Sequence, residues 1–214
     1  MDPLFTETGL FLCLEGGEGA GKSTQAALLV EWLEGLGHHV LLTREPGGTE
    51  VGTILRHIVL DNDTGELSPR TEVLLYAADK AEHVDQVVLP ALAEGTIVLT
   101  DRYVDSTLAY QGAGRHLDPA EVEHVARWAT SELRPHLTVV LDIDPAIGHT
   151  RFTGADRIEA EPLDFHHRVR QHFLDLAAVD PAHYLVVDAA LTPDEIHHAV
   201  RAAVEPWLTQ VEAS

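Results

Sequence analysis

Short apolar runs alternate along this 214-residue chain with longer segments in which apolar residues recur at helical spacing. The runs, which are typical of buried strands, lie at residues 10–14, 39–43, 96–100, 137–142 and 184–188. The helical segments lie at about residues 22–36, 68–94, 118–133, 162–179 and 193–211. This alternation predicts an α/β fold, a doubly wound parallel five-stranded sheet with helices on both faces. No repeat or linker-like change in composition interrupts the pattern, so we expect one domain over residues 1–214.

The chain is strongly acidic, with 35 Asp and Glu residues against 14 Lys and Arg and a formal charge of −21. Such a surface repels a phosphate backbone, and no basic stripe interrupts it, so we expect no nucleic-acid partner. If the substrates are anions, the few basic residues should gather where those anions bind. Acidity of this size can also mark a high-salt habitat, but an ordinary acidic surface is the favoured interpretation.

The single cysteine, Cys13, excludes a disulfide within the chain and a zinc site built from several cysteines. It lies in an apolar run and is predicted to be a small core residue. No apolar stretch reaches the ~20 residues needed to cross a bilayer, and residues 1–4 lack the basic region of a signal peptide. We therefore expect a cytoplasmic protein with no membrane partner.

Polar residues follow the predicted strands where each strand ends. In open α/β sheets, ligands bind beyond the carboxyl ends of the strands. The residues at these ends are Glu15 with a glycine-rich loop, Arg44 and Glu45, Asp101 and Arg102, Asp142 with Asp144, and Asp188. Their convergence predicts one site on one edge of the sheet.

The segment Gly16–Ser23 matches the phosphate-loop pattern G-x-x-x-x-G-K-[ST]. Because it follows a predicted strand and opens a predicted helix, its backbone N–H groups and the helix N-terminus can surround phosphates. Lys22 would reach the β- and γ-phosphates, and Ser23 would ligate Mg²⁺. The alternative, a glycine-rich turn with a chance Lys-Ser, is disfavoured by this context. The predicted ATP-binding residues of the loop are Gly16, Gly17, Glu18, Gly19, Ala20, Gly21, Lys22, Ser23 and Thr24.

A phosphate loop by itself does not distinguish ATPases, GTPases and kinases. The guanine-reading motif [NT]-K-x-D and the ABC-type signature L-S-G-G-Q are both absent from the sequence. Four other motifs follow the loop in order: REPGGT at 44–49, DRY at 101–103, STLAYQG at 106–112 and DRIE at 156–159. Together with EGAGKS at 18–23, they resemble the successive motifs of bacterial thymidylate kinases across residues 10 to about 190.

The resemblance implies a P-loop kinase, homodimeric, that uses ATP and Mg²⁺ to phosphorylate dTMP to dTDP. One alternative is another pyrimidine nucleotide or nucleoside kinase. The other is a nonenzymatic nucleotide-binding regulator on the same fold. The resemblance gives as substrate-binding residues Glu18, Arg44, Pro46, Tyr76, Lys80, Arg102, Ser106, Thr107, Tyr110 and Gln111.

Arg102 follows a buried strand, where its guanidinium can hold a phosphate bidentately. The resemblance implies that it holds the acceptor phosphate near the donor. The alternative is a structural ion pair with Asp101. Asp101 itself could orient Arg102, contact the Mg²⁺ shell with Ser23, or do both. The predicted catalytic residues are Lys22, Asp101, Arg102 and Arg151.

Tyr76 and Lys80 are four residues apart on a predicted helix, so their side chains share one face. The ring can stack on a base, and the cation can interact with base or phosphate. The family usually has Phe and Arg here, and lysine lacks the arginine fork of donors. The alternative for Tyr76 is a core residue of an amphipathic helix.

Thr107 and Gln111 are also four residues apart and uncharged, which suits recognition of a neutral pyrimidine edge. The resemblance implies that the thymine contacts lie here. It further implies that Tyr110 crowds the 2′ position and disfavours ribose, and that Glu18 hydrogen-bonds the 3′-hydroxyl. The alternative for Glu18 is an exposed loop residue.

A short lid-like segment is expected at about residues 150–160, with Arg151 as its catalytic and ATP-binding cation and Arg157 as a second cation. Family members without an arginine in the phosphate loop usually carry several basic lid residues, and this chain departs from that pattern. The adjacent histidines at 38–39, 166–167 and 197–198 are predicted to be surface residues rather than metal ligands.

Overall fold

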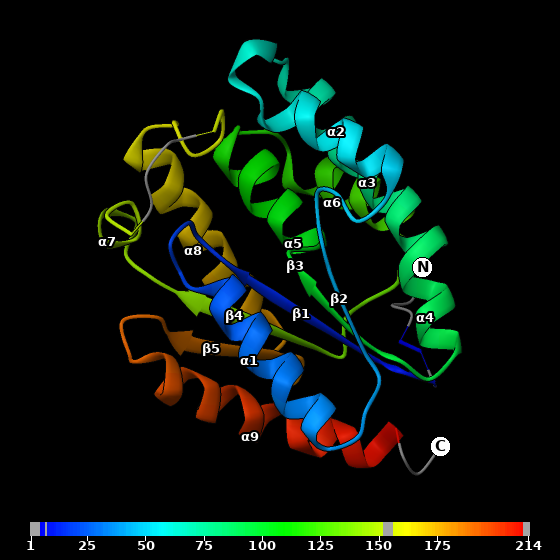
Figure 1. Cartoon of the computed structure of the whole chain (residues 1–214). Coiled ribbons are helices and arrows are strands. Elements are labelled where there is room, and N and C mark those ends of the chain that lie inside the picture. The colour runs from blue at the N-terminus through cyan, green and yellow to red at the C-terminus, as the bar shows by residue number, and fades with distance from the viewer. Residues whose placement is uncertain (1–4, 7, 152–155, 212–214) are drawn as a thin grey trace.

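The computed structural model describes residues 5–6, 8–151 and 156–211 and contains a parallel five-stranded sheet (Figure 1). The strands are β1 (Leu10–Gly16), β2 (Val40–Arg44), β3 (Ile97–Asp101), β4 (Leu137–Asp142) and β5 (Tyr184–Asp188). Their order is β2-β3-β1-β4-β5, and every neighbouring pair is parallel. The predicted strands and fold class are confirmed.

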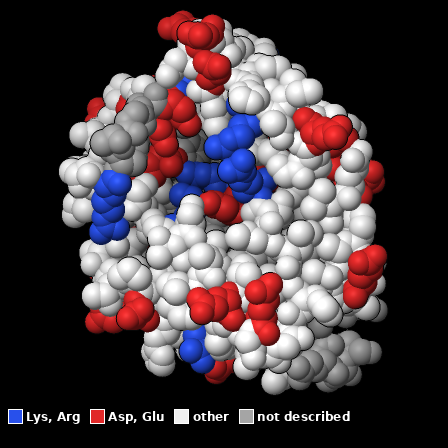
Figure 2. Space-filling model, viewed as in Figure 1, with Lys and Arg blue, Asp and Glu red and all other residues white. Residues whose placement is uncertain are grey.

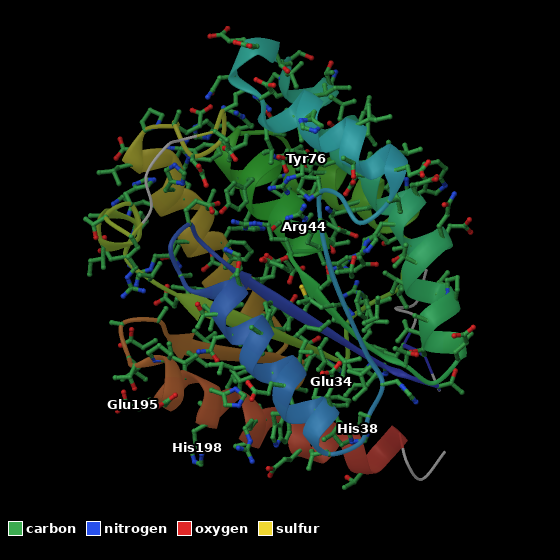
Figure 3. The ribbon with its side chains drawn as sticks, in the orientation of Figure 1. Glu34, His38, Arg44, Tyr76, Glu195 and His198 are labelled. Carbon is green, nitrogen blue, oxygen red and sulfur yellow. The ribbon has the colours of Figure 1, made fainter. Side chains whose placement is uncertain are left out.

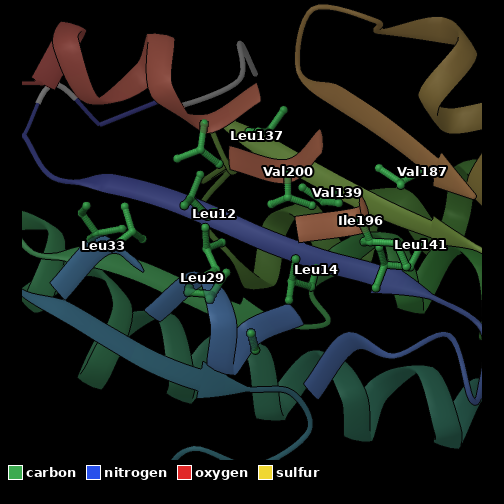
Figure 4. Packing of buried hydrophobic residues seen from close by; sticks show 14 of the residues in the cluster. Leu12, Leu14, Leu29, Leu33, Leu137, Val139, Leu141, Val187, Ile196 and Val200 are labelled. Carbon is green, nitrogen blue, oxygen red and sulfur yellow. The ribbon is translucent and has the colours of Figure 1, made fainter. Parts of the chain in front are cut away.

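Alternate residues of the central strand β1 pack into two different hydrophobic layers, because successive side chains of a strand point to opposite faces. Leu12 and Leu14 pack in one cluster with α1 (Lys22–Gly35) and α9 (Pro193–Val211), the two helices that cover one face (Figures 1 and 4). Phe11 and Cys13 pack in a second cluster on the other face. Both faces are therefore buried, and Cys13 is a core residue as predicted.

The second face is covered by several helices. They are α3 (Pro69–His83), α4 (Leu89–Ala93), α5 (Val104–Thr107), α6 (Pro119–Ala129) and α8 (Leu163–Val179). The single helix predicted over 68–94 is α3, a π-helical stretch (Val84–Val88) and α4 in succession. The helix predicted to reach residue 133 ends at Ala129, because Ser131 and Glu132 have left-handed φ angles of 52° and 61°.

In the described part of the chain, four helical segments were not predicted. They are α2 (Glu50–Leu60), a short 3₁₀ turn (Asn62–Thr64), α5 with the π-helical stretch that continues it (Leu108–Gly114), and α7 (Pro145–Gly148). A signal for α2 was present, because Thr49 is its N-cap and accepts a hydrogen bond from the Gly52 N–H at 2.8 Å. Within the described residues, no helix is long and apolar enough to span a membrane.

Candidate active site

The glycine loop joins β1 to α1 at the carboxyl edge of the sheet (Figure 1). Gly21 is the N-cap of α1 with a left-handed φ of 92°, which glycine adopts without steric cost. A Cβ on Gly19 would lie 2.3 Å from the carbonyl oxygen of Gly148 in α7. The loop can therefore approach α7 only because residue 19 has no side chain.

A wide cleft of about 680 Å³ opens over this loop. Lys22 lies in it, with Nζ 3.1 Å and 3.0 Å from the carbonyl oxygens of Gly16 and Gly17. Ser23 and Thr24 are exposed in the same cleft. The cleft is also lined by Glu18, Gly19, Ala20 and Gly21, together with Arg44, Asp101, Arg102 and Arg151. The predicted loop residues Gly16 and Gly17 do not line it.

A second, narrower pocket of about 110 Å³ lies beside the cleft. Predicted substrate-binding residues that line it are Glu18, Pro46, Tyr76, Lys80, Arg102, Ser106, Thr107, Tyr110 and Gln111. Arg44 lines only the cleft, and in Figure 3 it lies at the end of β2, below Tyr76 on α3. Among the described residues, four line both the cleft and the pocket: Glu18, Glu45, Arg56 and Arg102.

The basic residues gather at these two cavities, as the sequence predicted for anionic substrates. Figure 2 shows Lys and Arg side chains around a hollow in the upper half of the molecule. Six of the chain's 14 basic residues line the cleft or the pocket: Lys22, Arg44, Arg56, Lys80, Arg102 and Arg151.

Arg102 is held at the junction by a dense set of contacts. Its Nη1 donates to Gly16 O and Ser106 Oγ, each at 3.1 Å, and its Nη2 donates to Glu18 Oε1 at 2.5 Å. Its φ of 72° is unusual for a residue with a side chain and turns the arginine back over the loop. Its ion-pair partner among the described residues is Glu18 and not Asp101, so the alternative of a structural pair with Asp101 is not supported.

Glu18 is partly buried rather than exposed, so the simple surface-loop interpretation is wrong. Its Oε1 also accepts the hydroxyl proton of Tyr110 at 2.7 Å. Burial by itself would raise the pKa of Glu18, but the charges of Arg102 and Lys22 outweigh it and lower the pKa to about 2. Glu18 is therefore a carboxylate acceptor at neutral pH.

Glu15, at the end of β1, organises the segment that follows β3. Its Oε1 accepts from the Tyr103 and Ser106 N–H groups at 2.8 and 3.1 Å, and its Oε2 accepts from Ser106 Oγ at 2.7 Å. Burial and the charge of Asp105 raise the pKa of Glu15 to about 7. Since Ser106 Oγ also contacts Arg102, Glu15 supports the arginine indirectly. The sequence placed Glu15 at a strand end but gave it no role.

Tyr76 and Lys80 share one face of α3 as predicted, with Nζ 5.8 Å from the ring centroid. The Lys80 charge is already paired, because Nζ lies 2.9 Å from Glu45 Oε2 and both side chains are buried. Glu45 in turn contacts His83 Nδ1 at 2.7 Å. The sequence missed Glu45 as the partner that holds Lys80.

The donor set suits Mg²⁺ at the cleft. Asp101 Oδ1 is buried and has no hydrogen-bond partner in the described part of the chain. Ser23 and Asp101 line the same cleft. No cluster of three His, Cys, Asp or Glu side chains that could cage a metal occurs among the described residues. Two oxygen donors with open space around them suit an ion that keeps water or phosphate ligands.

The predicted lid residues are only partly described, because 152–155 lie outside the described residues. Arg151 is exposed, and its Nη1 donates to Gly19 O at 3.2 Å and to Ala189 O at 3.0 Å. Arg157 is placed differently from the prediction: it pairs with Glu72 on α3 at 2.7 Å instead of facing the cleft. The expectation that Arg157 acts on the donor phosphates is not supported.

His166 is buried in contact with His149 (ring centroids 4.5 Å apart), so that member of the histidine pairs is not a surface residue. His38 and His198 lie in the lower half of Figure 3, away from Tyr76 and the pocket that it lines.

Arg56, which lines both cavities, was missed because its helix α2 was not predicted.

A phosphate loop under one cavity and an arginine shared with a second cavity define a P-loop protein with two adjoining ligand sites. The family model for thymidylate kinase matches residues 14–200. The chain is 56% identical over 204 residues to a thymidylate kinase of Cutibacterium acnes, covering 94% of this chain and 99% of that protein. It is 50% identical to one of a Synechococcus species, covering 93% and 96%.

A crystal structure of thymidylate kinase from Ehrlichia chaffeensis superimposes with a TM-score of 0.77 and 29% identity. The match covers 92% of this chain and 99% of the other. The chain belongs to the thymidylate kinase family.

Proposed function

We propose that this protein transfers the γ-phosphoryl group of ATP to dTMP, giving dTDP and ADP. The observation that carries the proposal is the position of Arg102 between the phosphate loop and the second pocket. A cation at this junction can bind an acceptor phosphate within reach of a donor held by the loop.

On the donor side, ATP occupies the cleft with its phosphates against the loop N–H groups and Lys22. Ser23 and Asp101 would hold Mg²⁺, which would neutralise negative charge on the transferred group. Arg151, anchored on Gly19 O and Ala189 O, flanks the same cleft and approaches the donor from the lid side.

On the acceptor side, the base lies against the Tyr76 ring with its polar edge toward Thr107 and Gln111. Thr107 Oγ1 supports this placement, because it is buried and has no partner among the described residues. Such a hydroxyl is costly unless a ligand completes its hydrogen bonding. Tyr110 and Glu18 face the sugar, while Arg44, Pro46 and Ser106 complete the wall near the phosphate.

The phosphoryl transfer depends on where the positive charges of the site lie. The second pKa of a phosphate monoester is about 6, so the attacking oxygen is largely ionised at neutral pH and needs no general base. Arg102 donates to described residues with both N–H groups of Nη1 and one of Nη2, so the N–H of Nε and the second N–H of Nη2 remain for the acceptor phosphate. Arg56 adds a second cation at the junction. Together these cations offset the repulsion between two phosphate-bearing substrates.

We further propose that residues 1–214 work as one domain with a lid at about 150–160, that the protein is cytoplasmic, and that it is a homodimer. Exposed apolar side chains on α2, α3 and α6 support the dimer: Ile54 (62% exposed), Leu74 (59%) and Trp128 (71%). Light scattering should give twice the chain mass for the native protein. The Leu74→Asp variant should shift it toward the monomer, and a monomeric native protein would refute the dimer.

The decisive experiment is an ADP-release assay with ATP and Mg²⁺ against dTMP, dUMP, UMP and AMP. We expect dTMP to have the highest kcat/KM. Turnover of none of the four would contradict the kinase assignment, and preference for UMP would contradict the deoxyribose assignment of Tyr110 and Glu18.

A further inference from the structure

A buried carboxylate on α3 holds the side-chain amide of Gln111. Glu72 Oε1 lies 3.0 Å from Gln111 Nε2, and the carboxyl group is fully buried. Arg115 contacts both Glu72 oxygens, with Nε at 3.2 Å and Nη2 at 3.3 Å, and Arg157 Nη2 lies 2.7 Å from Oε2. Glu72 does not line the pocket, whereas Gln111 does.

The chemistry of this cluster decides which way the Gln111 amide faces. Burial would raise the pKa of Glu72, but the hydrogen bonds from Arg115 and Gln111 lower it below its usual value. An ionised carboxylate has no proton to donate, so the Gln111 atom beside it must be the NH₂ group. The carbonyl oxygen, Oε1, is then the atom of this amide that is available to the pocket.

An acceptor at this position lets the pocket distinguish pyrimidines by the order of hydrogen-bond donors and acceptors along the edge of the base. Thymine and uracil carry an N3–H donor beside a 4-oxo acceptor. Cytosine carries an N3 acceptor beside a 4-amino donor, which is the opposite pattern. Lys80, which also lines the pocket, is a donor only and matches a 4-oxo group. If Gln111 could rotate its amide, it would serve both bases equally well.

We propose that Glu72 is a positioning residue that fixes the Gln111 amide with its oxygen toward the substrate, and so makes the enzyme select 4-oxo over 4-amino pyrimidine nucleotides. The inference rests on the proposed function, because it takes a pyrimidine monophosphate as the acceptor.

The test is the ratio of kcat/KM for dTMP to kcat/KM for dCMP. In Glu72→Gln the partner of Gln111 can either accept or donate, so the amide is free to reverse. We expect the ratio to fall by about 10- to 100-fold, through relatively better use of dCMP, since a buried unpaired polar group costs about that much in discrimination. Glu72→Asp keeps an acceptor-only group and should restore most of the ratio.

Arg115→Gln is the matched control. It removes a guanidinium from the same cluster and its bond to Glu161, but Glu72 keeps its ion pair with Arg157 and so remains the acceptor for Gln111. It should lower the melting temperature and leave the dTMP:dCMP ratio within about 3-fold of the native value. The proposal is overturned if Glu72→Gln loses activity equally with both nucleotides, which is what a purely structural role would produce.

A second measurement covers the case in which Glu72→Gln does not fold. In the native protein, the ¹⁵N-labelled side-chain amide of Gln111, identified by its loss in Gln111→Leu, should show one proton protected from solvent exchange with and without dTMP. Rapid exchange of both protons would overturn the proposal. Native protein that phosphorylates neither nucleotide would refute the proposed function itself, and the inference with it.

Discussion

Arg102 Nη2 donates to Glu18 Oε1 at 2.5 Å, and this bond joins the residue after β3 to the middle of the phosphate loop. Both residues line both cavities. The guanidinium also lies over the Tyr110 ring, with Cζ 4.9 Å from its centroid. The phosphate loop, the pocket and the Tyr110 ring therefore all contact one charged pair. Substitutions in this pair should show which of the two substrates depends on it.

Replacing Arg102 by alanine should lower kcat/KM for dTMP by at least about 100-fold, because the cation that bridges the cavities is lost. The dissociation constant of ATP, measured by titration calorimetry, should change much less. Arg70→Ala is a suitable control, since Arg70 forms an exposed ion pair with Glu121 and should matter little. Loss of ATP affinity with dTMP affinity retained would reverse the assigned roles.

Tyr110 offers a test of sugar selection that separates its ring from its hydroxyl. Tyr110→Ala opens space beside Glu18 and should raise the relative kcat/KM for 5-methyl-UMP over dTMP by about 10-fold or more. Tyr110→Phe keeps the ring packed beside Phe165 and Phe173 and loses only the bond to Glu18. It should retain the preference for deoxyribose. Equal selectivity in the alanine variant and the native enzyme would contradict steric exclusion.

Lys80 and Glu45 form a buried ion pair, so removing one partner leaves an uncompensated charge. Lys80→Met should lower the free energy of unfolding by about 3 kcal/mol, at the low end of the usual range because Glu45 still contacts His83. Urea unfolding measures the effect. The double variant Lys80→Met with Glu45→Gln should recover part of the loss, and additive losses would show that the pair is not coupled.

The raised pKa of Glu15 predicts a pH-dependent stability. Burial, with the charge of Asp105, raises this pKa from 4.5 to about 7. Between these values the folded protein binds a proton that the unfolded chain has released, so this group's contribution to stability falls as pH rises from 4.5 to 7. Below pH 4.5 the Glu15 carboxyl group is protonated in both the folded and the unfolded state, so it no longer lowers the stability.

Glu15→Gln is nearly isosteric and cannot ionise. It should be more stable than the native protein at pH 8 by about 2–3 kcal/mol, and this advantage should shrink toward zero at pH 5. Chemical unfolding at the two pH values measures the difference. An advantage that does not change with pH, or a variant less stable at pH 8, would contradict the raised pKa.

Much of the fold was predictable because it depends on local patterns. Each strand is short and mostly apolar, with a polar residue at or near its carboxyl end, and N-caps such as Ser68 and Asp118 lie next to the helices that they begin. The helix α2 was missed although Thr49, its N-cap, is a local signal of the same kind. The end of α6 was missed because left-handed residues such as Ser131 have no clear sequence signal.

Residue order was enough to predict the sheet, the phosphate loop and most of the side chains near it, because strand ends meet at one edge in any doubly wound sheet. The pairing of charges, in contrast, is a property of the folded protein. Glu18 pairs with Arg102, which is 84 residues later in the chain, and Glu45 pairs with Lys80. Glu72 pairs with Arg157, which therefore does not face the cleft. Such pairing depends on distances of a few ångströms between segments remote in the chain, which residue order does not encode locally. For the same reason the phosphate loop could be predicted from the sequence, whereas the orientation of the Gln111 side-chain amide could not.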